Sequence, residues 1–174
     1  LYLFNMRFLI IFIFLTCNSF ASEVIDIKNL VINKNLKKYD DLTFLDAQNN
    51  IINLEDYRGN LILLNFWATW CAPCKDEMPS LDKLQENKKI DNIKIFPINV
   101  GKDNIENSLK FFNDLKIKNL EIYFDSKVTL AKKFGLRGIP TSIIFNKKGE
   151  EFARIIGSID FEDNEFIDWL SDFN

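Results

Sequence analysis

A short apolar run leads directly into a pair of cysteines, and this arrangement constrains the fold more than any other feature of the sequence. Residues 61–66 (LILLNF) are apolar except for Asn65, which is typical of a central strand buried on both faces of a sheet. The motif WATWCAPCK follows at residues 67–75, and residues 72–87 then carry apolar side chains at the spacing of one helix face. Because α/β sheets place their chemistry where a strand ends at a helix N-terminus, we expect a reactive site here.

Strand and helix patterns alternate along the rest of the chain. Residues 42–59 predict a hairpin with its turn at 48–50. Further strands are expected at residues 93–100, 120–125, 141–146 and 152–157, and further helices at 105–115, 126–135 and 161–173. The last two strands lie close enough in sequence to pair as an antiparallel hairpin, whereas the earlier ones alternate with helices. The order predicts an α/β fold with a central mixed sheet.

Polar residues and one glycine predict where two of the later helices begin and end. Asp103 and Glu106 have the spacing of a capping box at the start of the helix at 105–115. Ser126 is expected to cap the following helix, and Gly135 is expected to end it.

The first 40 residues are expected to lie outside the folded domain, which we place at residues 41–174. Residues 1–21 have the basic start, apolar centre and small final residues of an export signal. Cleavage after Ala21 and retention as a membrane anchor are both open, and Cys17 is expected to belong to the signal. Residues 22–40 are polar and weakly patterned, which indicates a leader into the fold.

Charge and cysteine content narrow the function further. The formal net charge is −3 with both signs interspersed, so nucleic-acid or membrane-surface binding is not expected. Without the signal, Cys71 and Cys74 are the only cysteines, in a compartment where disulfides persist.

Redox chemistry and four other uses of this cysteine pair can be weighed from its surroundings. A zinc site needs more ligands than one CxxC, and the chain has no histidine. Covalent haem attachment needs a histidine where Lys75 stands, and copper would find only Met78 nearby. A structural disulfide across two intervening residues closes a very short loop, so it removes little entropy from the unfolded chain and stabilises the fold little. Redox chemistry is therefore favoured, with no metal or other cofactor.

The predicted helix gives the two sulfurs different properties. Cys71 would lie at the helix N-terminus, where free N–H groups and the helix dipole favour its thiolate, so we expect it to attack. Cys74 would lie one turn further, more buried, and able to close the disulfide. Ala72 and Pro73 between them add no charge, and Pro73 suits the first helical turn.

Two stretches taken together resemble a known family. NFWATWCAPC, followed about 65 residues later by GIPTSIIFNKKG, resembles the thioredoxin fold and, within it, the TlpA/ResA-like secreted thiol-disulfide oxidoreductases. The resemblance runs from about Leu42 to the C-terminal end. It implies a thioredoxin-like fold whose central mixed sheet is flanked by helices, with an N-terminal hairpin and an inserted helix-strand element between residues 103 and 124.

The resemblance also implies roles for single residues. Cys71 matches the nucleophile, Cys74 the resolving thiol, and Pro140 the cis-proline of the loop that faces the disulfide. The local sequence alone favours a trans bond at that proline. The substrate-binding residues implied are Trp70, Ala72, Pro73 and Ile139.

Glu77 and Asn65 distinguish subgroups of the fold. Cytoplasmic thioredoxins resemble this chain but carry a buried aspartate where Asn65 stands. Taken alone, Glu77 is typical of a solvated helix residue. The resemblance implies instead that Glu77 accepts the proton of Cys74, because burial disfavours the thiolate form of that cysteine.

The function implied is that of an exported thiol-disulfide oxidoreductase in the periplasm or another extracytoplasmic space. It would act as a monomer on disulfides of envelope proteins, as a reductase in a group that includes reductases of cytochrome c maturation, and a membrane thiol donor would recycle it. A disulfide oxidase or isomerase, a peptide-binding module and a copper carrier are the alternatives.

Overall fold

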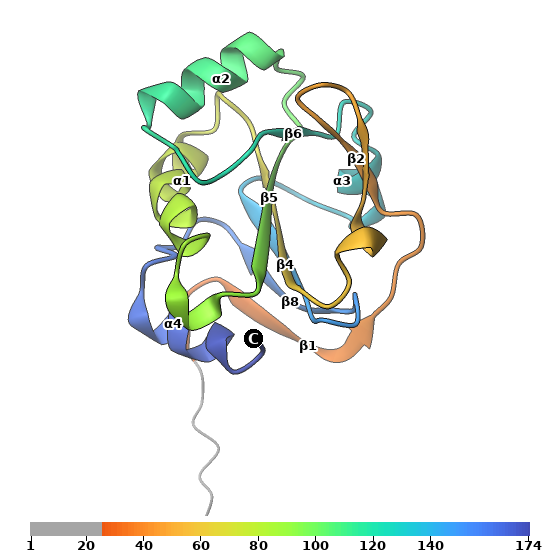
Figure 1. The fold of residues 1–174 in the computed structure, drawn as a ribbon, viewed down its shortest axis with the longest axis vertical. Helices are drawn as coiled ribbons and strands as arrows, with labels where there is room; N and C mark the ends of the chain where they lie inside the picture. The colour runs from red at the N-terminus through yellow and green to blue at the C-terminus, as the bar shows by residue number, and fades with distance from the viewer. Residues whose placement is uncertain (1–25) are drawn as a thin grey trace, which may run out of the picture.

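The computed structural model describes residues 26–174, which form one eight-stranded sheet with helices packed on it (Figure 1). The strands are β1 (Leu30–Lys37), β2 (Thr43–Asp46), β3 (Ile51–Asn53), β4 (Leu61–Trp67), β5 (Ile93–Asn99), β6 (Tyr123–Phe124), β7 (Thr141–Phe145) and β8 (Glu151–Ile156). The helices are α1 (Ala72–Leu84), α2 (Ile105–Asp114), α3 (Thr129–Lys133) and α4 (Asn164–Ser171). None of the helices in this range is long and apolar enough to cross a membrane. The signal expected at residues 1–21, with Cys17, lies outside the described residues.

β4 occupies the middle of the sheet, whose strand order is β1-β8-β7-β4-β5-β6-β2-β3. It pairs in parallel with β5 and antiparallel with β7, so the predicted mixed sheet is confirmed. All of its residues are buried, which explains the almost uninterrupted apolar run. The strand delivers the chain at Trp67 to the short loop that enters α1.

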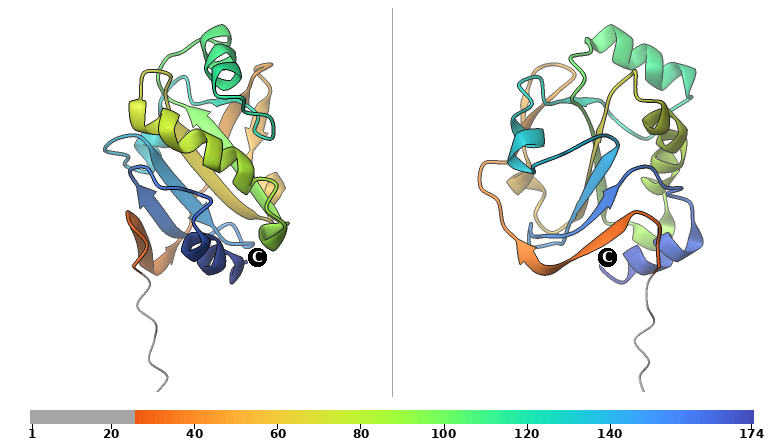
Figure 2. Two further views of the ribbon diagram at one scale, coloured as in Figure 1. Left: turned by 90° about the vertical axis from the view of Figure 1, so that its left-hand side faces the viewer. Right: turned by 180° about the vertical axis from the view of Figure 1, so that it is seen from behind.

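Helices cover both faces of this sheet (Figure 2). α1 and α4 pack on one face, where Met78 and Leu170 join Leu63 of β4 in one apolar cluster. α3 lies on the opposite face, where Leu130 joins Leu64 in a second cluster. The alternating side chains of β4 thus supply both halves of the core.

The expected hairpins and the inserted element are present. β2 pairs antiparallel with β3, and β7 with β8. The insertion consists of α2 and β6, and α2 is held near the end of β4 by aromatic packing. Phe111 and Phe112 lie against Trp67, with ring centroids 4.7 and 5.4 Å from its own. The fold class predicted from the sequence is therefore confirmed.

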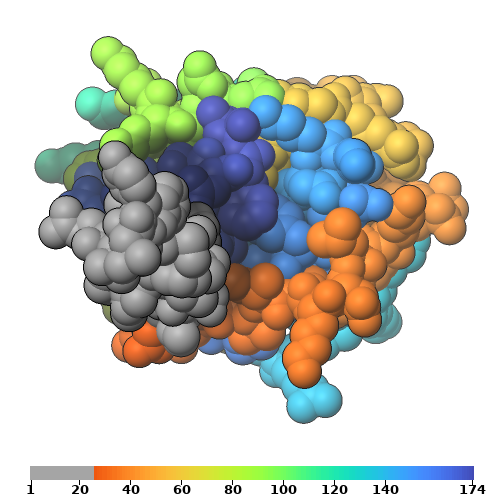
Figure 3. Space-filling model, turned by 90° about the horizontal axis from the view of Figure 1, so that it is seen from below, coloured from red at the N-terminus to blue at the C-terminus, as the bar shows by residue number. Residues whose placement is uncertain are grey.

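The expected leader at residues 22–40 contributes a strand to the sheet. β1 pairs antiparallel with β8 at one edge, so the sheet begins before residue 41. Seen from below, β1 (orange) lies beside the blue C-terminal part of the chain (Figure 3). Because most of its side chains are exposed, β1 lacks the apolar alternation by which strands are detected.

Two helix caps differ from those predicted. Asn104, not Asp103, caps α2, and its side chain accepts the N–H of Asn107 at 2.8 Å. Asp125, not Ser126, binds the free N–H groups at the start of α3, and its two carboxylate oxygens accept main-chain N–H groups of the helix at 2.7 and 3.0 Å. Each of the two carboxylate oxygens accepts one of these donors, and a negative charge is favourable at the N-terminal end of a helix.

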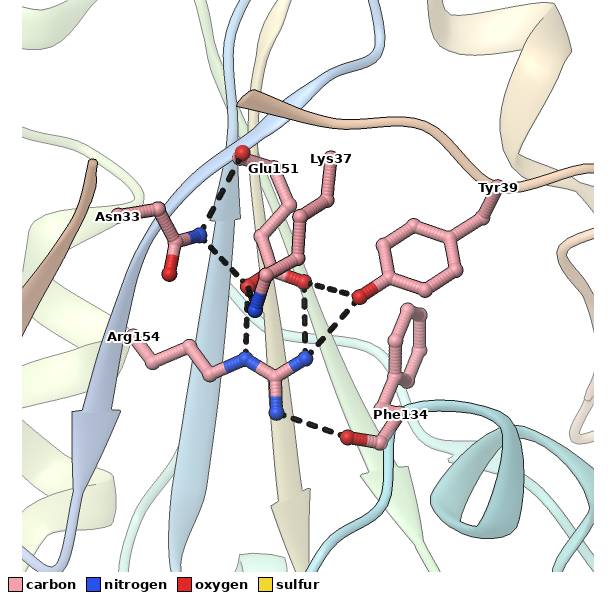
Figure 4. A network of polar contacts seen from close by, with 6 residues as sticks. All are labelled: Asn33, Lys37, Tyr39, Phe134, Glu151 and Arg154. Atoms are coloured by element: carbon pink, nitrogen blue, oxygen red, sulfur yellow. Dashed lines mark hydrogen bonds and ion pairs between the residues drawn. The ribbon is translucent and has the colours of Figure 1, made fainter. Parts of the chain in front are cut away.

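A buried ion pair fastens the β1 side of the sheet (Figure 4). Glu151 of β8 has no exposed surface and accepts two hydrogen bonds from Arg154, at 2.7 and 2.9 Å. Tyr39 and Asn33 donate to the same carboxylate at 2.7 and 2.8 Å. Burial alone raises the pKa of Glu151, but these hydrogen bonds outweigh burial and lower the pKa to about 2. The network ties the edge strand β1, through Asn33, and the following residue Tyr39 to the neighbouring strand β8.

Replacing Glu151 by glutamine is expected to lower the free energy of unfolding at pH 7 by about 3 kcal/mol, because Arg154 loses its counter-charge in a partly buried site. The low folded-state pKa means that the carboxylate stabilises fully above its ordinary value of 4.5, and that this stabilisation is lost as pH falls toward 2. The difference between wild type and variant should therefore shrink from pH 5 to pH 3 in urea unfolding. Glu55→Gln removes an exposed pair with Arg58 and should change stability by less than about 0.5 kcal/mol. Equal losses in both variants would contradict the assignment.

Candidate active site

The two cysteines of the motif form a disulfide at the start of α1. Cys71 is the N-cap residue, and its Sγ accepts the main-chain N–H of Cys74 at 3.3 Å. The two Cα atoms lie 5.3 Å apart, and the sulfurs are bonded. The structure therefore places Cys71 at the end of the helix where free N–H groups and the helix dipole favour a thiolate once the disulfide is reduced.

The two positions differ in accessibility, as the sequence predicted. Cys74 is completely buried, whereas Cys71 retains a small exposed fraction of 5%. Ala72 and Pro73 are exposed beside the disulfide, and Trp70 is 70% exposed. An attacking partner can reach the disulfide from this side, where apolar and aromatic surface surrounds it.

Pro140 lies at the same end of the sheet as the disulfide, and its bond to Ile139 is cis. The pairing of Thr141 with Phe66 brings the residue before β7 level with the end of β4, where the chain turns toward Cys71. The local expectation of a trans bond was therefore wrong, and the expectation from the family resemblance was right. Ile139 is half-buried, and its main-chain groups have no hydrogen-bond partner within residues 26–174.

Glu77 is buried, in contrast to the solvated position that the residue pattern alone suggested. It is 3% exposed and lies one turn after Cys74 on α1. Asn65 of β4 donates its amide to Oε1 of Glu77 at 2.8 Å and to Oγ of Ser142 at 3.0 Å. Asn65, where thioredoxins carry an acid, thus connects β4 to the glutamate.

Burial raises the pKa of Glu77 to about 8, although the amide of Asn65 and the main chain at Ile159 partly offset this effect. The other carboxyl oxygen, Oε2, has no hydrogen-bond partner among the described residues. A carboxyl group with such a pKa is divided between its two protonation states near neutral pH. It can therefore accept or release a proton inside the core.

Sequence reasoning missed one residue of the site, Asp103, which it assigned to a helix cap. Its two carboxylate oxygens accept the hydroxyl of Thr69 at 2.7 Å and the N–H of Thr69 at 3.0 Å. Asn99 at the end of β5 donates to the same carboxylate at 2.8 Å. β4 and β5 are neighbouring parallel strands, so their carboxyl ends meet, and this adjacency was the available signal. Asp103 fixes the turn that leads into Cys71.

Removing the Asp103 carboxylate is expected to loosen this turn. Partial burial raises the pKa of Asp103, but the hydrogen bonds from Thr69 and Asn99 outweigh it and hold the pKa below its ordinary value. The carboxylate therefore stabilises the turn above about pH 4, and the effect is lost at lower pH. Asp103→Ala should lower the free energy of unfolding by about 1–2 kcal/mol and speed hydrogen exchange of the Thr69 amide at pH 7.

A matched control is Asp114→Asn, which removes an exposed pair with Lys110 on α2. It should leave Thr69 exchange unchanged and stability within about 0.5 kcal/mol. Unchanged protection of Thr69 in Asp103→Ala would remove the positioning role.

This fold and this cysteine pair define a thiol-disulfide oxidoreductase built on the thioredoxin fold. The chain belongs to the AhpC/TSA family, whose model matches residues 35–150, and the resemblance to ResA-like proteins is confirmed. It is 31% identical over 125 residues to the thiol-disulfide oxidoreductase ResA of Geobacillus kaustophilus, which covers 72% of this chain and 71% of that protein.

Solved structures with low sequence identity share the fold. A thiol:disulfide interchange protein DsbE from Chlorobium tepidum superposes with a TM-score of 0.68 at 22% identity, over 81% of this chain and 99% of that one. The exposed lipoprotein thioredoxin Etrx1 of Streptococcus pneumoniae has a TM-score of 0.64 at 22% identity, over 76% of this chain and 98% of that one.

Proposed function

We propose that this protein is an exported reductase of disulfides in other envelope proteins, working through Cys71 and Cys74 with no further cofactor. The observation that carries the proposal is the disulfide at the N-terminus of α1, beside a buried glutamate. The name of its relative ResA, a thiol-disulfide oxidoreductase, supports the substrate class, and the exposed lipoprotein thioredoxin supports a place outside the cytoplasm. A role in cytochrome c maturation rests on the family resemblance.

The reaction needs two exchanges of sulfur bonds. The Cys71 thiolate attacks one sulfur of a substrate disulfide, so a mixed disulfide forms and one substrate thiolate leaves. Cys74 then loses its proton and attacks the sulfur of Cys71, which closes the Cys71–Cys74 disulfide and releases the second substrate thiolate. Two electrons pass from the protein to its substrate. A membrane thiol donor would return them, and the protein would act as a monomer.

Glu77 is proposed as the acceptor of the Cys74 proton. Burial of Cys74 disfavours its thiolate, so the second exchange depends on a base in the core. Glu77 lies on the same side of α1, and its pKa of about 8 suits transfer from a thiol near neutral pH. Asn65 holds one oxygen of the carboxyl group, which leaves the other oxygen for the proton.

The substrate chain is proposed to lie across the exposed surface around the disulfide. Trp70 offers an apolar wall, and Ala72 and Pro73 let a backbone approach without charge. Ile139 offers main-chain hydrogen-bonding groups that the protein itself leaves free within the described residues. An extended segment around a substrate disulfide can use these groups as a short added strand.

Trapping tests the function. Cys74→Ala should accumulate covalent partners joined to Cys71 in envelope extracts, because the second exchange is blocked, whereas Cys71→Ala should not. The potential of the disulfide against glutathione should be near that of reducing thioredoxins, about −270 mV. A reduction potential of about −120 mV would indicate a disulfide oxidase and contradict the proposed reductase. Peptide binding that survives Cys71→Ser with Cys74→Ser would favour a non-catalytic module.

Glu77→Gln should slow release of a preformed mixed disulfide on Cys71 by about tenfold or more at pH 7, because Cys74 loses its proton acceptor. The deficit should shrink above about pH 9, where hydroxide deprotonates the thiol directly. Single-turnover release measured from pH 6 to 10 gives the profile. Glu86→Gln, an exposed glutamate just after α1, is the matched control and should behave as wild type. A rate for Glu77→Gln equal to that of the control would return Glu77 to a structural role.

A further inference from the structure

The loop that follows β5 packs closely against the turn that leads from β4 to Cys71. The N–H of Val100 donates to the carbonyl of Trp67 at 3.0 Å, so the contact between the two parallel strands continues past their ends. Gly101 comes next, and its N–H donates to Oδ1 of Asn99 at 2.8 Å. These hydrogen bonds fix Gly101 beside the residues that precede the redox pair.

Gly101 lies where there is no room for a side chain. A Cβ atom at this position would lie 2.6 Å from Cβ of Ala68 and 2.8 Å from Oδ2 of Asp103. It would also lie 3.1 Å from Nε1 of Trp70. Carbon atoms in contact are normally about 3.5–4.0 Å apart, so each of these neighbours would have to move. Gly101 does not have a positive φ, so this glycine serves the close approach of two segments and not an unusual backbone conformation.

Of these three neighbours, Trp70 bears most directly on the reaction. It precedes Cys71 in the chain and is 70% exposed, so the rest of the protein covers little of its ring. The nitrogen edge of the indole lies over Gly101, in the space that a side chain would occupy. A ring that rests on the backbone in this way has less conformational freedom to lose when a partner binds than a ring that turns freely.

We propose that Gly101 is a positioning residue, which holds the indole of Trp70 beside Cys71 and thereby favours substrate segments with an aromatic side chain next to the attacked cysteine. This inference rests on the proposed function. Aromatic rings attract one another in offset-stacked or edge-to-face geometry beyond the effect of the area that they bury. Residues 69–73 carry no charge, so the surface beside the ring suits an uncharged partner.

The selection would act on the first exchange, because Trp70 adjoins Cys71 and not Cys74. Gly101 would contribute only through Trp70. A methyl group at residue 101 would displace the indole and leave it free to turn. An aromatic substrate side chain would then have to order the ring on binding, whereas a small polar side chain makes little use of the ring and would be attacked as before.

The test uses two synthetic peptides with the same intramolecular disulfide, one with a phenylalanine and the other with a serine beside each cysteine. The reduced full chain should react with the phenylalanine peptide about fivefold faster. Gly101→Ala should lower this preference below about twofold and leave the rate with the serine peptide within about twofold of wild type. Iodide quenching of indole fluorescence should rise in the variant, because Trp67 and Trp169 are buried and Trp70 is the ring that moves.

A second variant and a control separate positioning from strain. Gly101→Ala with Ala68→Gly removes the methyl group that the new side chain would strike first, and this variant should still lose the preference. Gly59→Ala is the control, because its φ of +95° strains a side chain in the turn before β4, while the added Cβ meets nothing within 4 Å. It should lower stability and keep the preference of wild type.

Trp70→Ala gives the decisive comparison. This variant should lose the preference for the phenylalanine peptide. Adding Gly101→Ala to it should change the rate with neither peptide any further, because the two residues act as one unit.

Two results would overturn the role of Gly101. One is a preference that survives in Gly101→Ala with Ala68→Gly, and the other is an effect of Gly101→Ala that is the same with and without Trp70, which would indicate that it acts through the turn. Equal rates for the two peptides with wild type would exclude the aromatic selection and leave the oxidoreductase in place. Failure to react with either peptide, or with any other disulfide, would instead contradict the proposed function.

Discussion

Burial of β4 on both faces is the constraint on which the rest of the molecule depends. Helices cover both faces of the sheet over this strand, so the chain becomes accessible only past the C-terminal end of β4. There it turns through residues 68–70 into α1, and Cys71 becomes the N-cap. The same strand carries Asn65, whose amide points to Glu77 rather than to solvent. The position of Cys71 and the environment of Glu77 thus both follow from one buried strand.

Two buried glutamates show how environment divides structural from chemical roles. Glu151 is surrounded by donors and a guanidinium, so it stays ionised, and the stability that it contributes is present at neutral pH. Glu77 has only the amide of Asn65 and a main-chain contribution from Ile159 to offset burial, and no basic side chain among the described residues bonds to it, so burial favours its neutral form. A carboxyl group with a raised folded-state pKa contributes less stability as pH rises from 4.5 to about 8. The protein retains a group that weakens it at neutral pH, which is expected of a functional site and not of a structural one.

The central elements could be predicted because they carry strong local patterns. The apolar run of β4, the helix face of α1 and the cysteine spacing each predict one structure, and tertiary packing agrees with all three. β1 was missed because an edge strand with exposed side chains carries no apolar period. The role of Asp103 was missed because its partner Thr69 lies 34 residues away, and a local capping pattern competed for the same residue. Only the pairing of β4 with β5 brings these residues together.

Glu77 lies where the redox pair meets the core of the sheet. It follows Cys74 by one turn of α1, and the amide of Asn65 on β4 holds one of its oxygens. The proposed attack by Cys71 needs no base, because the N-terminus of α1 already favours its thiolate. The proposed attack by Cys74 does need one, because this sulfur is completely buried. Of the two exchanges, the second would therefore depend on the protonation state of Glu77, and the environment of one buried carboxyl group would set how fast a substrate is released.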